Sequence, residues 1–271
     1  MAHPQIATFA RLADGGAKPM RKLEGQKTLL GRTMHSIAYD EVHDEFFLPV
    51  PFPQAILAFR GGANGEEAPV RYIQGPSTGL TYPNRLAVDP VHNEIFVPQT
   101  NKVLVYPRDG NGDVAPIRVL QGPDTLLNTN AVAVDPVHNL LIVVSELPGE
   151  PETPRILIFN RTDNGNVKPK AMIGGPKSGF RRLSGPFIVY PPRGWIILGD
   201  RGEGELASDT AYVGVWSVED NGDVPPRWRI GGPNGVLQMP RGVALNPKHK
   251  ELIVSDKRLN AVLTFSFPEM F

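Results

Sequence analysis

The chain repeats one short segment several times, and this repeat limits the possible folds more than any other feature of the sequence. Residues 68–76, Ala-Pro-Val-Arg-Tyr-Ile-Gln-Gly-Pro, return at 115–123 as Ala-Pro-Ile-Arg-Val-Leu-Gln-Gly-Pro, and weaker copies follow at 168–176 and 225–233. A divergent copy lies near the start, at residues 18–25. Repeats spaced by roughly 50 residues indicate a propeller or a similar array, in which each repeat is one small structural unit.

Each repeat contains four short stretches of strand-forming residues. In one repeat the first two strands contain residues 86–88 and 95–97, which are continuous apolar runs typical of strands buried on both faces. The third strand contains residues 103–106, and the repeated segment itself is the partly polar fourth strand. We therefore expect burial to fall from the first strand to the fourth. The pair Asn111-Gly112, which has counterparts in other repeats, predicts a tight hairpin turn between the third and fourth strands.

These features predict an all-β fold: a single closed β-propeller domain spanning residues 1–271, built from four-stranded antiparallel blades. Five strands of the first type can be identified, which predicts five blades. The last repeat stops after its third strand at residues 261–265, and we expect residues 20–25 to join this blade as its fourth strand. That pairing closes the ring and removes an exposed sheet edge. Residues 6–9 form an additional strand of the third type, so a six-bladed propeller is the alternative.

Composition excludes several classes of partner and site. The chain has 28 basic and 28 acidic residues, so no net field attracts nucleic acid or an anionic membrane, and neither is expected as a partner. It contains no cysteine, which excludes disulfides, thiolate metal ligands and cysteine nucleophiles. No apolar run has the length of a membrane span, and the first residues lack a signal-peptide pattern. We expect a soluble monomer, either cytoplasmic or secreted after removal of a signal.

Three strands of one repeat carry a family resemblance. They are residues 86–89, 94–97 and 103–106, with the sequences Leu-Ala-Val-Asp, Glu-Ile-Phe-Val and Val-Leu-Val-Tyr. These strands resemble NHL-type repeats and, more distantly, the propellers of the gluconolactonase and strictosidine-synthase-like group. The resemblance implies that function lies at the mouth of the central channel, where loops lead into first strands and out of second strands. It also implies a divalent cation there, such as calcium, held by asparagine and carboxylate oxygens.

The residues expected on this face differ from repeat to repeat, although the repeat is otherwise faithful. By resemblance, Asn84 and Asn130 occupy the asparagine-type position, and Glu146, Asp200 and Asp256 are the carboxylates available to a metal ion. Oxygen ligands of this kind suit a hard cation such as calcium. The resemblance therefore implies a metal site built from Glu146, Asp200 and Asp256.

Two kinds of basic side chain on the same face suggest other chemistry. His35 suits general-base work or zinc, whereas Arg85 and Arg241 favour an anionic ligand over a bare cation. The candidate residues are His35, Asp200 and Asp256 as catalytic groups; Asn84, Arg85, Asn130 and Arg241 as ligand-binding groups; and Glu146, Asp200 and Asp256 as metal ligands.

Two hypotheses on function follow. In the first, the channel mouth binds a small and anionic molecule and acts as a lactonase-like hydrolase or a lyase. In the second, the same face and its two longest loops, residues 146–154 and 201–211, bind a protein or a glycan without catalysis. The adjacent Arg181-Arg182 is interpreted as part of a solvated loop.

Four histidines follow an aspartate or asparagine at a fixed spacing of three residues. Asp-Pro turns use such side chains to satisfy backbone groups, so we interpret them as structural rather than as a metal ring. The histidines are His43, His92, His138 and His249.

Overall fold

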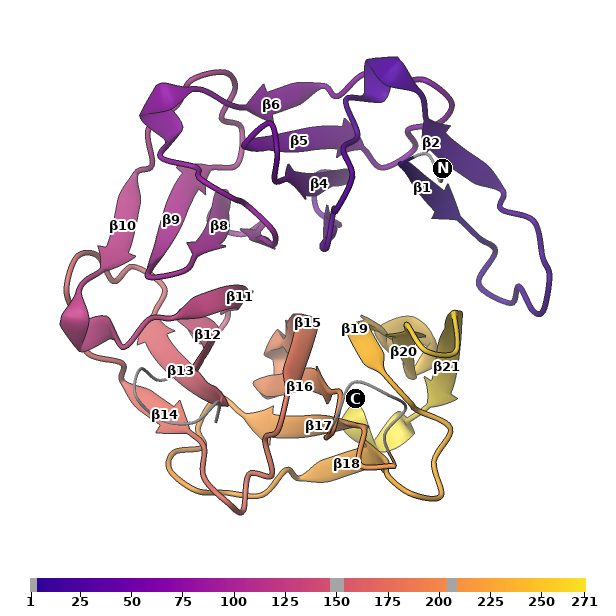
Figure 1. The fold of residues 1–271 in the computed structure, drawn as a ribbon, viewed down its shortest axis with the longest axis vertical. Coiled ribbons are helices and arrows are strands. Elements are labelled where there is room, and N and C mark those ends of the chain that lie inside the picture. Colours follow the sequence, from indigo (N-terminus) through magenta and orange to yellow (C-terminus); the bar gives the residue numbers. More distant parts are fainter. Residues whose placement is uncertain (1–3, 147–153, 204–208) are drawn as a thin grey trace. The chain divides into compact units, whose positions relative to one another are not determined.

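A computed structural model describes residues 4–146, 154–203 and 209–271. Within these ranges the chain forms strands and short 3-10 turns (Figure 1). The strands are β1 (Gln5–Thr8), β2 (Arg21–Glu24), β3 (Ala38–Asp40), β4 (Glu45–Val50), β5 (Ala55–Arg60), β6 (Arg71–Ile73), β7 (Ala87–Asp89), β8 (Glu94–Gln99), β9 (Lys102–Pro107), β10 (Arg118–Gln121), β11 (Thr129–Asp135), β12 (Leu140–Glu146), β13 (Pro154–Asn160), β14 (Ala171–Ile173), β15 (Leu183–Tyr190), β16 (Trp195–Asp200), β17 (Tyr212–Ser217), β18 (Trp228–Gly231), β19 (Pro240–Asn246), β20 (Glu251–Asp256) and β21 (Ala261–Ser266). The 3-10 turns are η1 (Gln26–Thr28), η2 (Pro76–Thr78), η3 (Pro123–Thr125), η4 (Pro191–Arg193), η5 (Pro247–His249) and η6 (Pro268–Met270).

The strands form successive sheets in which each strand pairs with the next one in sequence. Four sheets have four strands, β3–β6, β7–β10, β11–β14 and β15–β18, and a fifth has three, β19–β21. Neighbouring strands run antiparallel, as in a blade that meanders outward from its first strand. This is the all-β fold of a five-bladed β-propeller, which confirms the predicted class and blade number.

The chain divides into two compact units, and the division passes through β8 and β9. Unit 1 comprises residues 1–95 and 105–117, and unit 2 comprises residues 96–104 and 118–271. Within unit 1 the first strands β3 and β7 lie next to each other, and within unit 2 β15 lies beside both β11 and β19. The expectation of one domain over residues 1–271 stays a prediction.

Burial does not fall steadily from the first strand to the fourth, as the sequence led us to expect. In the β3–β6 sheet, five of the six residues of β4 and of β5 are buried, whereas β3 is partly exposed and its Tyr39 is 59% exposed. The two central strands have a strand on each side and apolar residues on both faces, so they lose most contact with water. In the four-stranded blades the core therefore lies in the second and third strands, whereas no residue of β21, the third strand of the last blade, is buried.

The two N-terminal strands form a small sheet of their own. β2 pairs with β1, with Ile6 opposite Leu23, and the described part of the last sheet has three strands. Residues 20–25 belong to unit 1 and residues 261–265 to unit 2, so the pairing expected between them stays a prediction. The extra third-type strand at residues 6–9 thus forms half a blade with β2.

The Asn-Gly pairs connect one blade to the preceding one, and the predicted tight hairpin turn is wrong. The connection from β9 to β10 runs from Pro107 to Arg118, and the Gly112 N–H donates to the Tyr72 carbonyl at 2.7 Å while Asn111 Oδ1 accepts from Tyr72 N–H at 3.2 Å. Only the glycine has positive φ, at 77°. Asparagine is thus used here for its side-chain oxygen. Equivalent contacts join Asn164 to Val119 and Asn221 to Met172.

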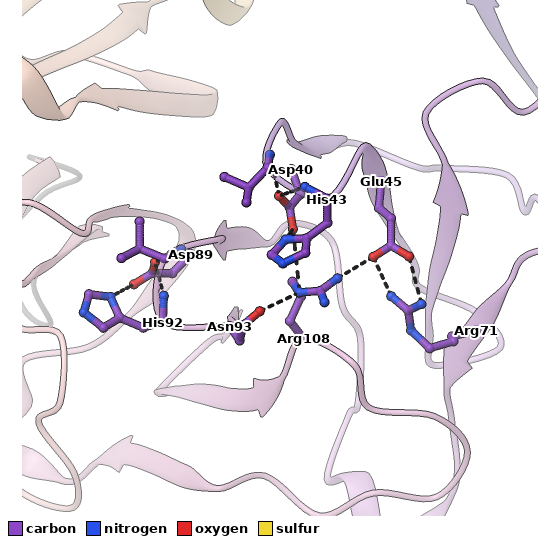
Figure 2. A network of polar contacts seen from close by, with 10 residues as sticks. Asp40, His43, Glu45, Arg71, Asp89, His92, Asn93 and Arg108 are labelled. Carbon is purple, nitrogen blue, oxygen red and sulfur yellow. Dashed lines mark hydrogen bonds and ion pairs between the residues drawn. The ribbon is translucent and has the colours of Figure 1, made fainter.

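The repeated Asp-x-x-His turns are structural, as predicted. The buried Asp40 carboxylate accepts from the backbone N–H groups of Val42 and His43 at 3.0 Å each and lies 2.8 Å from His43 Nδ1 (Figure 2). Asp89 and Asp135 hold their own turns in the same way.

Three positions form a joint between one blade and the next: the first residue of the second strand, the first residue of the fourth strand, and the residue after the next blade's third strand. In the first joint these are Glu45, Arg71 and Arg108 (Figure 2). Arg71 donates two hydrogen bonds to Glu45, at 2.8 and 2.6 Å, and Arg108 donates a third at 2.5 Å. Arg108 Nε also donates to Asn93 at 2.9 Å and lies 3.7 Å from the Asp40 carboxylate. The first joint is therefore a partly buried ion-pair network.

The same three positions carry no charge in the third and fourth joints, which lie within unit 2. The third joint consists of Leu140, Ala171 and Val218, which belong to one apolar cluster. The fourth joint consists of Trp195, Trp228 and Phe267: the two indoles pack edge to face at 5.4 Å, and Phe267 packs against Trp228 at 5.6 Å.

Candidate functional site

The first strands of unit 2 are irregular where the sequence predicts ligand-binding residues. The β11 ladder shifts register between Thr129 and Ala131, and the β19 ladder shifts between Pro240 and Gly242. Asn130 and Arg241 lie at these shifts, although the side chain of Asn130 is outside the described part of the chain. Bulges of this kind redirect a side chain out of the regular sheet pattern and are frequent beside active sites.

A glycine fixes the backbone that carries Arg241. Gly185, at the start of β15, has a φ of 69°, and a β-carbon at this position would overlap the carbonyl oxygen of Arg241. Residue 185 must therefore be glycine, both for its left-handed conformation and for the close approach of the two backbones. This contact holds β15 against the bulge in β19.

Asp200 ends β16, and its carboxylate shapes the surrounding loops. It is fully buried and accepts backbone N–H groups from Arg181 at 2.8 Å, Arg182 at 3.2 Å and Gly202 at 2.8 Å. Several N–H donors satisfy a buried carboxylate without a cation. These bonds favour a role of Asp200 in positioning the backbone of Arg182 and Arg201, and its predicted catalytic and metal-binding roles stay predictions.

Asp256 has the same role at the end of β20. It accepts N–H groups from Gln238 at 2.8 Å, Met239 at 2.9 Å and Arg258 at 2.9 Å. In the β11–β14 sheet the matching residue is Ser145, whose hydroxyl accepts from Asn128 N–H and donates to the Leu126 carbonyl. The residues at these matching positions of the second strands thus hold the chain that leads into their own blade.

Three arginines of unit 2 gather beside Asp200. Arg201 is partly buried; burial first, and then the positive charges of Arg241 and Arg182, lower the pKa of its guanidinium, while Asp200 and Glu146 oppose the effect. The Nε atom of Arg201 is buried and has no hydrogen-bond partner among residues 4–146, 154–203 and 209–271. A guanidinium with an unsatisfied buried N–H among like charges favours a bound anion. We call Arg182, Arg201 and Arg241 the arginine cluster.

A metal centre is not assembled by the carboxylates proposed for it. Across the described ranges, no three histidine, aspartate or glutamate side chains gather so that they could hold a metal ion, and this includes Glu146, Asp200 and Asp256. Buried hydrogen bonds to backbone amides explain the result for Asp200 and Asp256, and Glu146 is exposed.

The other candidates belong to unit 1. His35 is exposed, Arg85 is partly buried, and Asn84 has a buried Oδ1 without a hydrogen-bond partner among the described residues. A site that combines these residues with Asp200 and Asp256 stays a prediction, because the two sets lie in different units.

Sequence reasoning missed two members of the arginine cluster. Arg182 was interpreted as part of a solvated loop, and Arg201 was not singled out. Arg201 directly follows Asp200 at the end of a second strand, and this position is the signal that could have identified it.

The fold is similar to that of many solved protein chains. A chain from the crystal structure of a nidogen/laminin complex has a TM-score of 0.63 and 16% sequence identity, with coverage of 100% of this chain and 89% of that chain. A chain of Kuenenia stuttgartiensis hydrazine synthase has a TM-score of 0.60 and 11% identity, covering 93% of this chain and 68% of that chain. The similarity is one of fold.

Searches by sequence gave no further relation: no protein-family model and no curated protein matches the chain. In the described residues, no helix is long and apolar enough to cross a membrane.

Proposed function

We propose that this propeller binds a compact anionic molecule at the arginine cluster. Arg201 is the observation that carries the proposal, because its buried Nε has no hydrogen-bond partner in the described part of the chain and its neighbours Arg182 and Arg241 repel it. A carboxylate or phosphate oxygen would accept from Nε and offset the repulsion, and guanidinium groups bind such oxyanions through paired hydrogen bonds. The bulge at Arg241 and the amide bonds of Asp200 support the cluster as a preorganised site.

The resemblance to gluconolactonase-like and NHL-type propellers extends this proposal to a hydrolase or lyase. Chemistry of that kind needs a general base or a metal-bound water near the ligand. Asp200 and Asp256 already accept several backbone N–H groups, which supports binding more than catalysis. His35 stays the candidate base for the enzymatic version.

The proposal is tested with two anions, inorganic phosphate and succinate. Each is added separately at low salt, and its binding is measured by calorimetry and by thermal unfolding. We expect one of them to stabilise the protein, by about 2.7 kcal/mol at a concentration of 100 times Kd. Arg201→Ala and Arg241→Ala should each weaken binding at least tenfold. Arg258→Ala is the matched control, because Arg258 is exposed and its replacement removes the same charge from the loop after β20. Equal losses in all three variants, or no binding of either anion, would refute the site.

A second candidate function is a protein-binding propeller. It is favoured by the similarity to a chain crystallised in a nidogen/laminin complex and by an exposed aromatic pair in unit 1. Phe52 and Tyr82 are 68% and 46% exposed and pack edge to face at 5.9 Å. Exposed aromatic side chains are frequent anchors of protein interfaces. Capture of a partner that is lost in Phe52→Ala/Tyr82→Ala but kept in Arg201→Ala would favour this function over anion binding.

A further inference from the structure

Four Asn-Gly pairs each bind an earlier strand of the chain through two hydrogen bonds to a single residue. The asparagine Oδ1 accepts the backbone N–H of that residue, and the glycine N–H donates to its carbonyl oxygen. We call this pair of bonds a clasp, and each clasp lies within one of the two units. The clasps join Asn64-Gly65 to Lys22, Asn111-Gly112 to Tyr72, Asn164-Gly165 to Val119 and Asn221-Gly222 to Met172.

An asparagine followed by glycine is prone to deamidation, because glycine has no β-carbon to hinder attack by its backbone nitrogen. The glycine nitrogen loses its proton and attacks the asparagine Cγ, the bond from Cγ to Nδ2 breaks, and ammonia leaves. The product is a succinimide ring. Water then adds to one of the two ring carbonyls and gives aspartate or isoaspartate. The two reacting groups, the glycine N–H and the asparagine side-chain amide, are the groups that form the clasp.

A closed clasp directs both reacting groups toward the neighbouring strand. Asn111 Oδ1 lies 3.2 Å from Tyr72 N, and Gly112 N lies 2.7 Å from the Tyr72 carbonyl oxygen. A third bond, from the Gln74 N–H to the Gly112 carbonyl at 3.0 Å, holds the glycine on its other side. While these bonds are closed, the glycine nitrogen keeps its proton and the asparagine amide cannot turn toward it.

Burial does not protect the Asn-Gly pairs from this reaction. All four asparagines of the clasps are exposed, so water and hydroxide reach them in the folded protein. Among the described residues, apart from the chain neighbours, no atom lies within 4 Å of the position that a β-carbon would take at any of the four glycines. The hydrogen bonds of the clasp are therefore what holds the reaction back. A clasp opens when two blades separate locally, which requires less free energy than global unfolding.

We propose that the four Asn-Gly pairs are deamidation sites that react only when their clasps open, and that isoaspartate formation then prevents the clasp from closing. Aspartate keeps an acceptor oxygen at the position of Oδ1. In isoaspartate the former side-chain carbonyl belongs to the main chain, which gains a carbon atom before the glycine nitrogen. The acceptor and the glycine N–H then no longer face one residue. No residue of the arginine cluster takes part, so this proposal and the proposed anion site fail independently.

Isoaspartate at each pair can be measured by liquid chromatography and mass spectrometry of proteolytic peptides. At mildly alkaline pH, each pair should react at least tenfold more slowly in the folded protein than in the protein unfolded by urea. In the folded protein the four rates should rank in the same order as the hydrogen-exchange rates of the four glycine amides, because both reactions need an open clasp. Equal rates in folded and unfolded protein, or a different ranking, would overturn the proposal.

A pair of variants tests one clasp alone. In an antiparallel strand the N–H and C=O of one residue point to the same side, so the Tyr72 N–H serves the clasp and Tyr72→Pro removes no bond between β5 and β6. Isoaspartate at Asn111 should form at least fivefold faster in Tyr72→Pro than in Tyr72→Val, which keeps the N–H, whereas the rate at Asn164 should be equal in both. An unchanged rate at Asn111, or the same increase at Asn164, would show that the clasp does not control the reaction. If Tyr72→Pro fails to fold, the ranking against hydrogen exchange decides the question.

Discussion

The first and third joints occupy equivalent positions between consecutive blades, but one is charged and the other is apolar. Both lie between consecutive blades and use the same three positions, yet one contains Glu45, Arg71 and Arg108 and the other Leu140, Ala171 and Val218. The carboxylate of the first joint receives three hydrogen bonds, whereas the third joint is filled by apolar side chains. All three residues differ together, because a lone charge in the apolar joint, or a lone apolar residue in the charged one, would leave a partly buried group unpaired.

The backbone contacts that link the blades are the same in both regions, whereas the side chains in the joints differ. The Asn-Gly contacts and the Asp-x-x-His turns occur in both regions, next to either kind of joint. Backbone geometry is therefore repeated while the joint varies. We infer that the joint residues adjust stability as sets and can be exchanged as sets.

The largest effect is expected from a charge placed in the apolar joint. Leu140 is 5% exposed within its cluster, so Leu140→Glu buries a carboxylate without a cationic partner. The free energy of unfolding at neutral pH should fall by about 4 kcal/mol, because an unpaired buried ion keeps most of its desolvation cost. Urea unfolding measures the loss, and Leu140→Met is the control, with less than about 1.5 kcal/mol expected. A loss of the same size in both variants would show that packing, not charge, is responsible.

A somewhat smaller loss is expected when the charged joint loses its carboxylate. Glu45→Leu leaves Arg71 and Arg108 facing each other without their shared acceptor. The free energy of unfolding should fall by about 3 kcal/mol, the cost typical of breaking one partner out of a buried ion pair. Urea unfolding again provides the measurement, and Glu67→Leu, which breaks an exposed ion pair with Arg60, should have a clearly smaller effect, because ion pairs in contact with water contribute little to stability.

Exchange of the whole set should restore most of that loss. The triple variant Glu45→Leu/Arg71→Ala/Arg108→Val gives the first joint the residues of the third. Its stability should lie within about 1 kcal/mol of the original protein, since apolar replacement of a complete buried ion pair is often neutral. A triple variant as unstable as Glu45→Leu would show that the two joints differ in shape, and the idea of interchangeable sets would be wrong.

The same distinction explains how much could be predicted from the sequence. The Asp40 turn and the central strands of each blade depend on neighbours within a few residues, and both were predicted. The contacts between blades depend on residues far apart in sequence: Met172 meets Asn221 across 49 residues. A local pattern such as Asn-Gly showed that a turn forms, but it could not show that the asparagine oxygen serves the preceding blade.

The candidate site was predicted in part for the same reason. Arg241 and Asp200 were selected by their positions in the repeat; Arg241 lies at the register shift of β19, and Asp200 ends β16. Arg182 joins them only because Asp200 draws the backbone of residues 181 and 182 toward the end of β16. The position of Arg182 thus depends on a side chain that bends a loop, and no repeated pattern in the sequence reveals such a contact.

The smallest effect, and the most specific to the charged joint, is its dependence on pH. The hydrogen bonds from Arg71, followed by the charges of Arg71 and Arg108, hold the pKa of Glu45 below its ordinary value despite partial burial. A carboxyl whose pKa is lowered by folding stabilises the folded state above its unfolded pKa, about 4.3 for glutamate, and loses that contribution as pH falls through the folded pKa. The stability difference between the original protein and Glu45→Gln should thus be constant from pH 7 to about pH 5 and shrink below pH 4. Urea midpoints of the two proteins at a series of pH values give this difference directly, and other acid-sensitive groups cancel because both proteins contain them. In the triple variant, which has the apolar joint, Glu45 and both arginines are absent, so this acid-dependent contribution should be absent as well. A difference that persists unchanged to pH 3 would mean that Glu45 stabilises the joint through its shape and not through its charge.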